Sequence, residues 1–296
     1  MTDGATKYFL KKYRFKNVEK IKEIHSVKKY FSDGGISVIM PINTKDGNSF
    51  FELEESFYAL FPFIDDRQMQ GEQITNKAVI SLAETLARMH LLGRDAKIPV
   101  SDSFKMWDRQ KRLSAIEQIL EKISQIKNKS DFDIRAEKNI LFKKNIIESK
   151  KEEYENLKFN NDHLIHGDYM IQNVFFDGND NVSYVFDFEK TQYAPRFFEL
   201  FRAMIYSSFF DKEITEAMVA RTKLFLDSYL EIYPATKEDL VENFEMYYLR
   251  SAHSVWVEEE HYLRNNDRVD ELLKSDIVRV NYLTNNLESL KLFLFK

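Results

Sequence analysis

The chain has 296 residues, 44% of them hydrophobic and 31% charged, enough for one large hydrophobic core or two smaller ones. It has no cysteine, which excludes disulfides and cysteine nucleophiles, and no apolar run of the ~18 residues that a membrane helix needs. Its net charge is −5 and its basic residues are dispersed, so we expect a cytoplasmic protein without a nucleic-acid or membrane partner, of unspecified oligomeric state.

The N-terminal segment predicts a strand over residues 7–15. Period-two alternation puts Phe9, Lys11, Tyr13 and Phe15 on one face. A lysine on an otherwise apolar face is costly unless its ammonium meets a charge, so Lys11 is the candidate for binding an anionic ligand. Lys12 is the competing choice, and a pair of surface lysines on an edge strand is the alternative.

A helix is predicted next, over residues 18–31. Its apolar stripe consists of Val18, Ile21, Ile24, Val27 and Phe31. Glu23 lies at the edge of this stripe and can reach inward, which makes it the candidate partner of Lys11. Glu19 is the second choice, and an acid that simply faces solvent is the alternative.

Two further strand regions follow. Residues 37–40 and 50–53, separated by the turn at 44–48, predict a hairpin. The apolar run 57–64, which contains Phe61 and Phe63, predicts another strand, in which most aromatic side chains belong to the core.

The rest of the chain is mainly helical outside residues 164–189. Helices are predicted over residues 76–94, 105–127, 131–157, 195–208, 213–232, 237–263 and 267–294. His90 falls on the apolar stripe of the first of these helices, so we expect a hydrogen-bonded packing residue.

The most informative stretch is His166-Gly167-Asp168-Tyr169-Met170-Ile171-Gln172-Asn173, followed by Val185-Phe186-Asp187-Phe188-Glu189. The turn at 177–181 predicts a hairpin that brings Asp187 beside Asn173. Their carboxylate and amide oxygens suit Mg²⁺, and Asp168 would accept the proton of an incoming hydroxyl. The set predicts magnesium-dependent phosphoryl transfer; ordinary turn residues are the alternative.

These motifs, together with residues 195–200, resemble the aminoglycoside phosphotransferase and choline kinase superfamily, with its homoserine kinase-like and spore-coat kinase-like branches. The resemblance implies a bilobal, protein-kinase-like α+β fold: an antiparallel N-lobe over residues 1–64 and a helical C-lobe over 65–296. Only about ten residues precede Lys11, so we expect the family's first hairpin and its Gly-rich turn to be missing, through truncation or reduction. Glu199 stands where the family usually has an aspartate that braces the catalytic loop.

The resemblance also implies roles for the candidate residues. Lys11, braced by Glu23, would hold the phosphates of ATP, and the run 57–64, an edge strand and hinge that includes Phe61 and Phe63, would hold adenine. Asp168 would be the catalytic base in a loop fixed by His166. Asn173 and Asp187 would hold Mg²⁺. Glu189, where protein kinases have a glycine, is either a second metal ligand or a solvated or capping acid.

The acceptor is implied to lie between the catalytic loop and the C-terminal helices. The candidate residues there are Tyr247, Tyr248, Trp256, Glu258, Glu259, Glu260 and Tyr262. Acids among aromatics suit a cation, such as an aminoglycoside or a choline-like molecule, although the three glutamates also fit a solvated helix face.

The predicted function is therefore ATP- and Mg-dependent transfer to a hydroxyl of a small cationic molecule. Homoserine and sugars remain open as acceptors. The rival functions are a non-catalytic nucleotide-binding or scaffold protein on the same fold, and a metal-dependent hydrolase that uses Asp168, Asp187 and His166.

Overall fold

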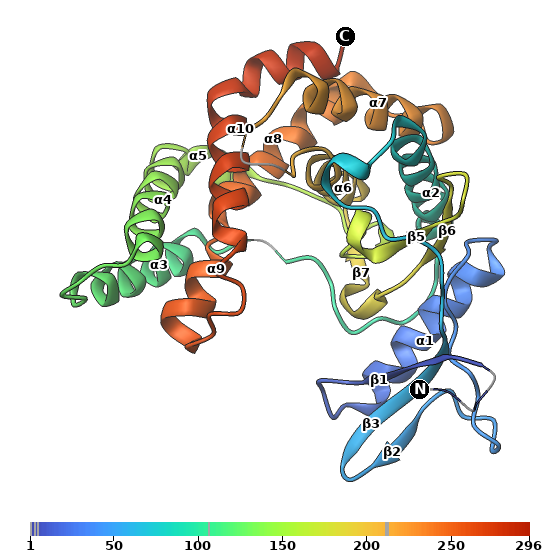
Figure 1. Ribbon diagram of the computed structural model, residues 1–296. Helices are drawn as coiled ribbons and strands as arrows, with labels where there is room; N and C mark the ends of the chain where they lie inside the picture. Colours follow the sequence, from blue (N-terminus) through green and yellow to red (C-terminus); the bar gives the residue numbers. More distant parts are fainter. Residues whose placement is uncertain (1, 3, 5, 106, 211–212) are drawn as a thin grey trace. The chain divides into compact units, whose positions relative to one another are not determined.

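The computed structural model describes residues 2, 4, 6–105, 107–210 and 213–296 (Figure 1). The chain divides into two compact units. The mixed unit consists of Met1–Phe104, Asn160–Ser207 and Leu224–Pro234, and the helical unit of Lys105–Phe159, Ser208–Lys223 and Ala235–Lys296. The expected α+β class is confirmed. The expected boundary between an N-lobe and a C-lobe after residue 64 stays a prediction. The two compact units are defined by their internal contacts and do not test it.

The mixed unit begins with a three-stranded antiparallel sheet. The strands β1 (Tyr8–Lys12), β2 (Phe51–Leu53) and β3 (Ser56–Pro62) lie in the order β1-β3-β2, so the strand expected at an edge is central. Residues 37–40 and 50–53 do not form the predicted hairpin. Instead, β2 turns directly into β3 through Glu54 and Glu55, whose φ angles are 48° and 56°. This left-handed two-residue turn lacks the Gly or Asn that usually marks it, which is why the sequence did not reveal it.

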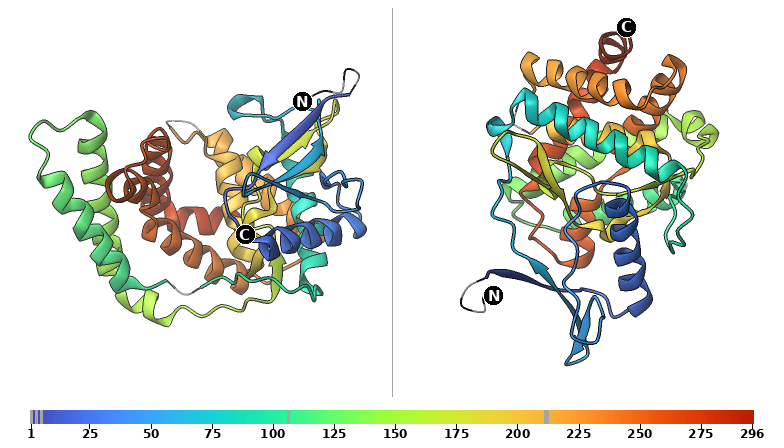
Figure 2. Two further views of the ribbon diagram at one scale, coloured as in Figure 1. Left: turned by 90° about the horizontal axis from the view of Figure 1, so that it is seen from below. Right: turned by 90° about the vertical axis from the view of Figure 1, so that its right-hand side faces the viewer.

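Helix α1 (Val18–Asp33) packs on this sheet, as the orthogonal views of Figure 2 also show. Asn17 caps its N-terminus by accepting a hydrogen bond from the Lys20 amide. The shared core consists of Tyr13, Ile21, Ile39, Phe57, Ala59 and Phe61. The segment around Val38 pairs in parallel with Val185 rather than with β2.

The remaining part of the mixed unit carries the two motifs. Helix α2 (Asn76–Arg94) lies against β4 (His163–Ile165), which pairs with β7 (Gln192–Ala194). A Cβ at Gly93 would come within 2.1 Å of the Leu164 carbonyl oxygen, so only glycine permits this approach. The strands β5 (Val174–Phe176) and β6 (Val182–Val185) form the predicted hairpin. The short helices η1 (Gly71–Gln73), η2 (Ile171–Asn173) and η3 (Phe188–Lys190) and helix α6 (Arg196–Ser208) complete this region.

The helical unit contains helices only, among the residues described. They are α3 (Arg109–Ser124), α4 (Asp131–Ser149), α5 (Lys151–Asn156), α8 (Lys237–His253), α9 (Trp256–Glu258), the π-helix η4 (Glu259–Leu263) and α10 (Leu272–Leu294). Helix α7 (Glu216–Ile232) runs from this unit into the mixed one. Met106, in the helix expected over residues 105–127, lies outside the described residues. No described helix combines the length and apolarity needed to cross a membrane.

The long helix predicted over residues 237–263 is interrupted after His253. At this interruption the Lys143 ammonium donates to the Ser254 carbonyl oxygen at 2.6 Å and pairs with Asp276 at 2.5 Å. Lys143 is fully buried, so these partners are needed to offset its desolvation. The carbonyl of Ser254 thus bonds a side chain from another helix.

Candidate active site

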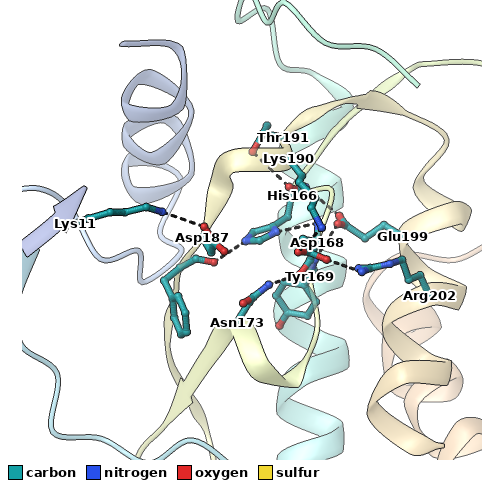
Figure 3. A network of polar contacts seen from close by, with 11 residues as sticks. Lys11, His166, Asp168, Tyr169, Asn173, Asp187, Lys190, Thr191, Glu199 and Arg202 are labelled. Carbon is teal, nitrogen blue, oxygen red and sulfur yellow. Dashed lines mark hydrogen bonds and ion pairs between the residues drawn. The ribbon is translucent and has the colours of Figure 1, made fainter. Parts of the chain in front are cut away.

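The predicted catalytic loop, residues 166–173, runs from β4 to β5 and carries His166, Asp168 and Asn173 (Figure 3). Gly167 has φ 82°, and a Cβ there would lie 1.9 Å from the Lys190 carbonyl oxygen. Both the left-handed backbone and the close approach of the second motif therefore require glycine. This contact sets residues 166–168 directly against the segment that follows Asp187.

A buried carboxylate anchors the loop from helix α6. Glu199 is 1% exposed and accepts hydrogen bonds from the backbone amides of His166 (3.0 Å) and Tyr169 (3.2 Å). Burial alone would raise the pKa of Glu199, but its hydrogen bond from His90 and the loop amides keep that pKa below the usual value. The longer acid thus contacts the loop, as the sequence suggested.

His90 has the packing role predicted for it. Its Nε2 lies 3.2 Å from Glu199 and its Nδ1 lies 2.8 Å from the Tyr229 hydroxyl. Burial lowers the pKa of His90, so the neutral ring donates to the carboxylate and accepts from Tyr229.

His166 connects the two motifs. It is fully buried, its Nε2 donates to the Phe186 carbonyl oxygen at 2.8 Å, and its Nδ1 accepts from the Asp168 amide at 3.2 Å. Burial lowers the pKa of His166, which keeps the ring neutral. With both nitrogens occupied by backbone groups, His166 is suited to holding the loop rather than to proton transfer.

Two cations contact the Asp168 carboxylate. The Arg202 Nη2 lies 2.5 Å from Oδ1 and the Lys190 Nζ lies 2.9 Å from Oδ2 (Figure 3). Burial would raise the pKa of Asp168, but the charges of Arg202 and then Lys190 hold that pKa below its usual value. Sequence reasoning missed both cations. Arg202 stands three residues after Glu199 on α6, a spacing that puts both side chains on one helix face and was available as a signal.

The β5–β6 hairpin brings the two predicted metal ligands together. Val174 pairs with Val185, and the Phe186 amide donates to the Asn173 carbonyl oxygen at 3.0 Å. The Asn173 Nδ2 donates to the Asp168 carbonyl oxygen at 2.8 Å, which leaves its Oδ1 as the donor for a cation. Asp187 has φ 64°, a left-handed conformation that costs energy and is concentrated at functional sites.

This donor set fits Mg²⁺. The described residues contain no cluster of three or more His, Cys, Asp or Glu side chains able to hold a metal. Magnesium commonly uses one or two carboxylates and completes its shell with water and substrate phosphates, so an amide oxygen and one carboxylate suffice.

Lys11 contacts the second motif, Val185–Glu189, through two ion pairs. Its Nζ lies 3.1 Å from the Asp187 carboxylate and 2.6 Å from that of Glu189. The competing Lys12 instead lies over the Tyr58 ring, 5.7 Å from its centroid.

The pairing of Lys11 with Glu23 is wrong. The Glu23 carboxylate accepts from the Lys20 ammonium at 2.5 Å and from the Ser101 amide at 2.7 Å, and no described contact joins it to Lys11. Its position at the edge of the stripe turns it toward residues 101–102. Glu189, expected as a metal ligand or a solvated acid, takes its place beside Lys11.

A cavity of about 370 Å³ adjoins this group. Phe61 and Phe63, predicted to hold adenine, line it together with Lys11 and Asp187. Lys28 of α1 also lines the cavity, and sequence reasoning missed it. Its spacing was a signal, because Lys28 falls seven residues after Ile21 and four after Ile24, on the apolar stripe.

Comparison with known families decides the identity. Residues 1–234 match the model of a family described as "Phosphotransferase enzyme family". The chain belongs to this family. It is accordingly a phosphotransferase with a kinase-like fold, as the sequence predicted. No curated protein matches its sequence.

Solved structures share the fold of this phosphotransferase. A spectinomycin phosphotransferase, solved with ADP and spectinomycin, has a TM-score of 0.67 and 18% identity, over 97% of this chain and 86% of its own. An amicoumacin kinase, solved with AMP-PNP and Ca²⁺, has a TM-score of 0.60 and 14% identity, with 92% and 83% covered. A microcompartment-associated aminopropanol kinase has a TM-score of 0.62 and 13% identity, with 99% and 89% covered.

The acids expected at an acceptor site are all engaged within the helical unit of the phosphotransferase. Glu258 is fully buried and accepts from Asn139 at 2.8 Å, Glu259 pairs with Arg112, and Glu260 pairs with Arg264. Consecutive helical side chains diverge, and these three do so. Of the aromatic candidates, Tyr247, Tyr248 and Tyr262 are buried, and Trp256 is 41% exposed.

Proposed function

We propose that this phosphotransferase uses Mg²⁺ to move the γ-phosphoryl group of ATP directly to a hydroxyl of a small, amine-bearing molecule. The observation that carries the proposal is the convergence of Asp168 and Asn173 on the segment of Asp187, which lines a cavity together with Lys11. A scaffold that only bound nucleotide would have little use for Asp168. Because ATP is the donor, we propose the cytoplasm as the compartment.

Each side chain has a definite task in this proposal. Asn173 and Asp187 would hold Mg²⁺, which neutralises charge on the phosphates. Lys11 binds phosphate oxygens, and Phe61 and Phe63 enclose the base. Asp168 accepts a hydrogen bond from the acceptor hydroxyl and takes its proton as the new O–P bond forms.

The cations around Asp168 refine its role. Because Arg202 and Lys190 keep the pKa of Asp168 low, its carboxylate is a weak base that orients the hydroxyl and receives the proton late in the transfer. Lys190 is 63% exposed and can leave Asp168 to face the transferring phosphoryl group, which carries the developing negative charge.

The acceptor class rests on the solved neighbours. One of them is named for aminopropanol, a molecule with an amine and a hydroxyl, and others are named for spectinomycin and amicoumacin. The engaged glutamates of the helical unit give no separate support for a cation. An aminoglycoside-like or choline-like acceptor is therefore proposed first, and a homoserine-type acceptor second.

Two substitutions test the assigned chemistry. We expect Asp168→Asn to lower kcat about 10²- to 10⁴-fold, the usual contribution of a general base, while the Kd of Mg·ATP stays within about twofold. Asp187→Asn should instead weaken Mg·ATP binding, since it removes the charged ligand of the cation. Asp95→Asn, a surface carboxylate paired with Arg94, is the matched control.

The measurements are ATP consumption with a panel of aminoglycosides, choline, ethanolamine, aminopropanol, homoserine and sugars, and calorimetric titration with Mg·ATP. Unchanged turnover in Asp168→Asn would refute the base assignment. Absence of ATP binding up to millimolar concentration in the wild type would instead favour a scaffold protein that does not use nucleotide.

A further inference from the structure

Lys28 is a buried ammonium group that no acidic side chain among the described residues contacts. It is 6% exposed, and its Nζ donates one hydrogen bond, to the Ile39 carbonyl oxygen at 3.0 Å. The same Nζ lies 4.3 Å from the centroid of the Phe61 ring. Among the described residues, no carboxylate pairs with Lys28. Two of its three N–H groups therefore have no acceptor among those residues.

A packing role does not account for a lysine here. The position belongs to the buried stripe of α1, where Ile21, Ile24 and Phe31 serve the core. An apolar residue would avoid the large cost of burying an uncompensated charge. A binding role does account for it, because Lys28 lines the same cavity as Lys11, Phe61 and Asp187.

The surrounding charges distinguish the two lysines of the cavity. Lys11, on β1, already contacts the carboxylates of Asp187 and Glu189. His25, a titratable residue one turn before Lys28 on α1, has its nitrogens facing the Tyr13 hydroxyl and the Ser49 hydroxyl. Burial lowers the pKa of His25 to about 4, so this ring is neutral. Of these two lysines, Lys28 is thus the one that no carboxylate of the described residues contacts.

The lowered pKa of Lys28 is consistent with an ammonium group that lacks a bound anion. Burial, and then the charge of Lys11, lower the pKa of Lys28 to about 7, while Asp187 and Glu189 act in the opposite direction. An incoming polyanion would favour the protonated form, so its binding would be accompanied by proton uptake near and above neutral pH.

We propose that Lys28 is a second phosphate-binding cation of the nucleotide site, which donates its two remaining N–H groups to the phosphate oxygens of a nucleoside di- or triphosphate. This inference rests on the proposed use of ATP. It assigns to α1 a task other than bracing Lys11: the helix supplies a hydrogen-bond donor to the ligand, and Glu189 takes the bracing position.

The test is a ligand series on the full chain at pH 6.5, with Lys28→Met. We expect ADP and Mg·ATP to bind about 10- to 100-fold more weakly than to the wild type, the range for losing a hydrogen bond to a charged group. Adenosine, which has no phosphate, should bind within about twofold. The control is Lys29→Met on the same helix, a surface lysine paired with Asp33, which should leave all three affinities unchanged.

A second variant and a second measurement distinguish loss of phosphate binding from misfolding of Lys28→Met. Lys28→Gln retains a donor for the Ile39 carbonyl oxygen but removes the charge, and should show the same phosphate-dependent loss. Calorimetry of Mg·ATP binding at pH 8 in buffers of different ionisation enthalpy should reveal proton uptake by the wild type. That uptake should be absent in Lys28→Gln.

The outcomes separate this inference from the proposed function. If the wild type binds and consumes ATP while both Lys28 variants bind ADP and Mg·ATP normally, Lys28 is not a phosphate ligand and the proposed function stands. An equal loss for adenosine and ADP would assign Lys28 to packing instead. If the wild type binds no nucleotide, both proposals fail.

Discussion

The buried carboxylate of Glu199 offers the sharpest test of how the catalytic loop is held. Three donors converge on its two oxygens: the His166 amide and His90 Nε2 on Oε2, and the Tyr169 amide on Oε1. Glu199→Gln keeps the size of the side chain but leaves a single acceptor oxygen. If that oxygen faces His166 and His90, the new NH₂ group faces the Tyr169 amide, donor against donor.

The expected cost follows from this count. The variant loses at least one hydrogen bond to a charged group, worth ~1.5–3 kcal/mol, and leaves a buried donor unsatisfied at ~1–3 kcal/mol. Removing a buried charge recovers part of the total, because a neutral amide costs less to desolvate. We therefore expect the free energy of unfolding to fall by about 3 kcal/mol, a large part of the ~5–15 kcal/mol typical of a domain.

Urea denaturation measures this change, with Glu84→Gln as control. Glu84 forms a surface pair with Arg88, so its loss should cost under about 0.5 kcal/mol. In the folded Glu199→Gln variant, kcat should fall more than the affinity for Mg·ATP, because the loop that carries Asp168 is less well held. A variant as stable as the wild type within about 0.5 kcal/mol would refute the reasoning.

Two further predictions concern the same loop. Arg202→Met should move the acid limb of the kcat/KM profile to higher pH. Arg202 lowers the pKa of Asp168, whereas burial alone raises that pKa. An acid limb at unchanged pH would contradict an effect of Arg202 on the ionisation of Asp168. Gly167→Ala should abolish most turnover and destabilise the fold by more than Gly35→Ala, because both have positive φ but only Gly167 also meets the Lys190 backbone. Initial rates and thermal melts compare the two variants. Equal melting temperatures would show that the clash between a Cβ at position 167 and the Lys190 carbonyl does not destabilise the fold.

The catalytic loop and the hairpin were predictable because their signals are local. The turn formers at 177–181 and the apolar runs on either side predict a hairpin by themselves, and its register brings Asp187 to Asn173. The β2–β3 hairpin was not predictable in this way. Its turn residues Glu54 and Glu55 adopt positive φ without the residue types that normally announce it.

The electrostatic partners depended on packing between distant segments. Glu23 and Lys28 lie on one helix, and periodicity alone allowed Glu23 to reach inward. The orientation of α1 about its axis places Lys28 at the cavity and Glu23 beside Ser101. The ion pair of Arg202 with Asp168 likewise depends on α6 lying beside the loop.

By itself, then, the sequence determined the α+β class, the phosphoryl-transfer motifs and the residues expected to carry the chemistry, since these follow from short-range spacing and from the atoms that each side chain offers. Only the tertiary structure decided which charges meet. Lys11 pairs with Glu189, Asp168 lies between Arg202 and Lys190, and Lys28 lines the cavity without a carboxylate partner among the described residues. The physical reason is that an ion pair depends on distances of a few ångströms between segments far apart in the chain, and the packing of helices on sheets sets those distances.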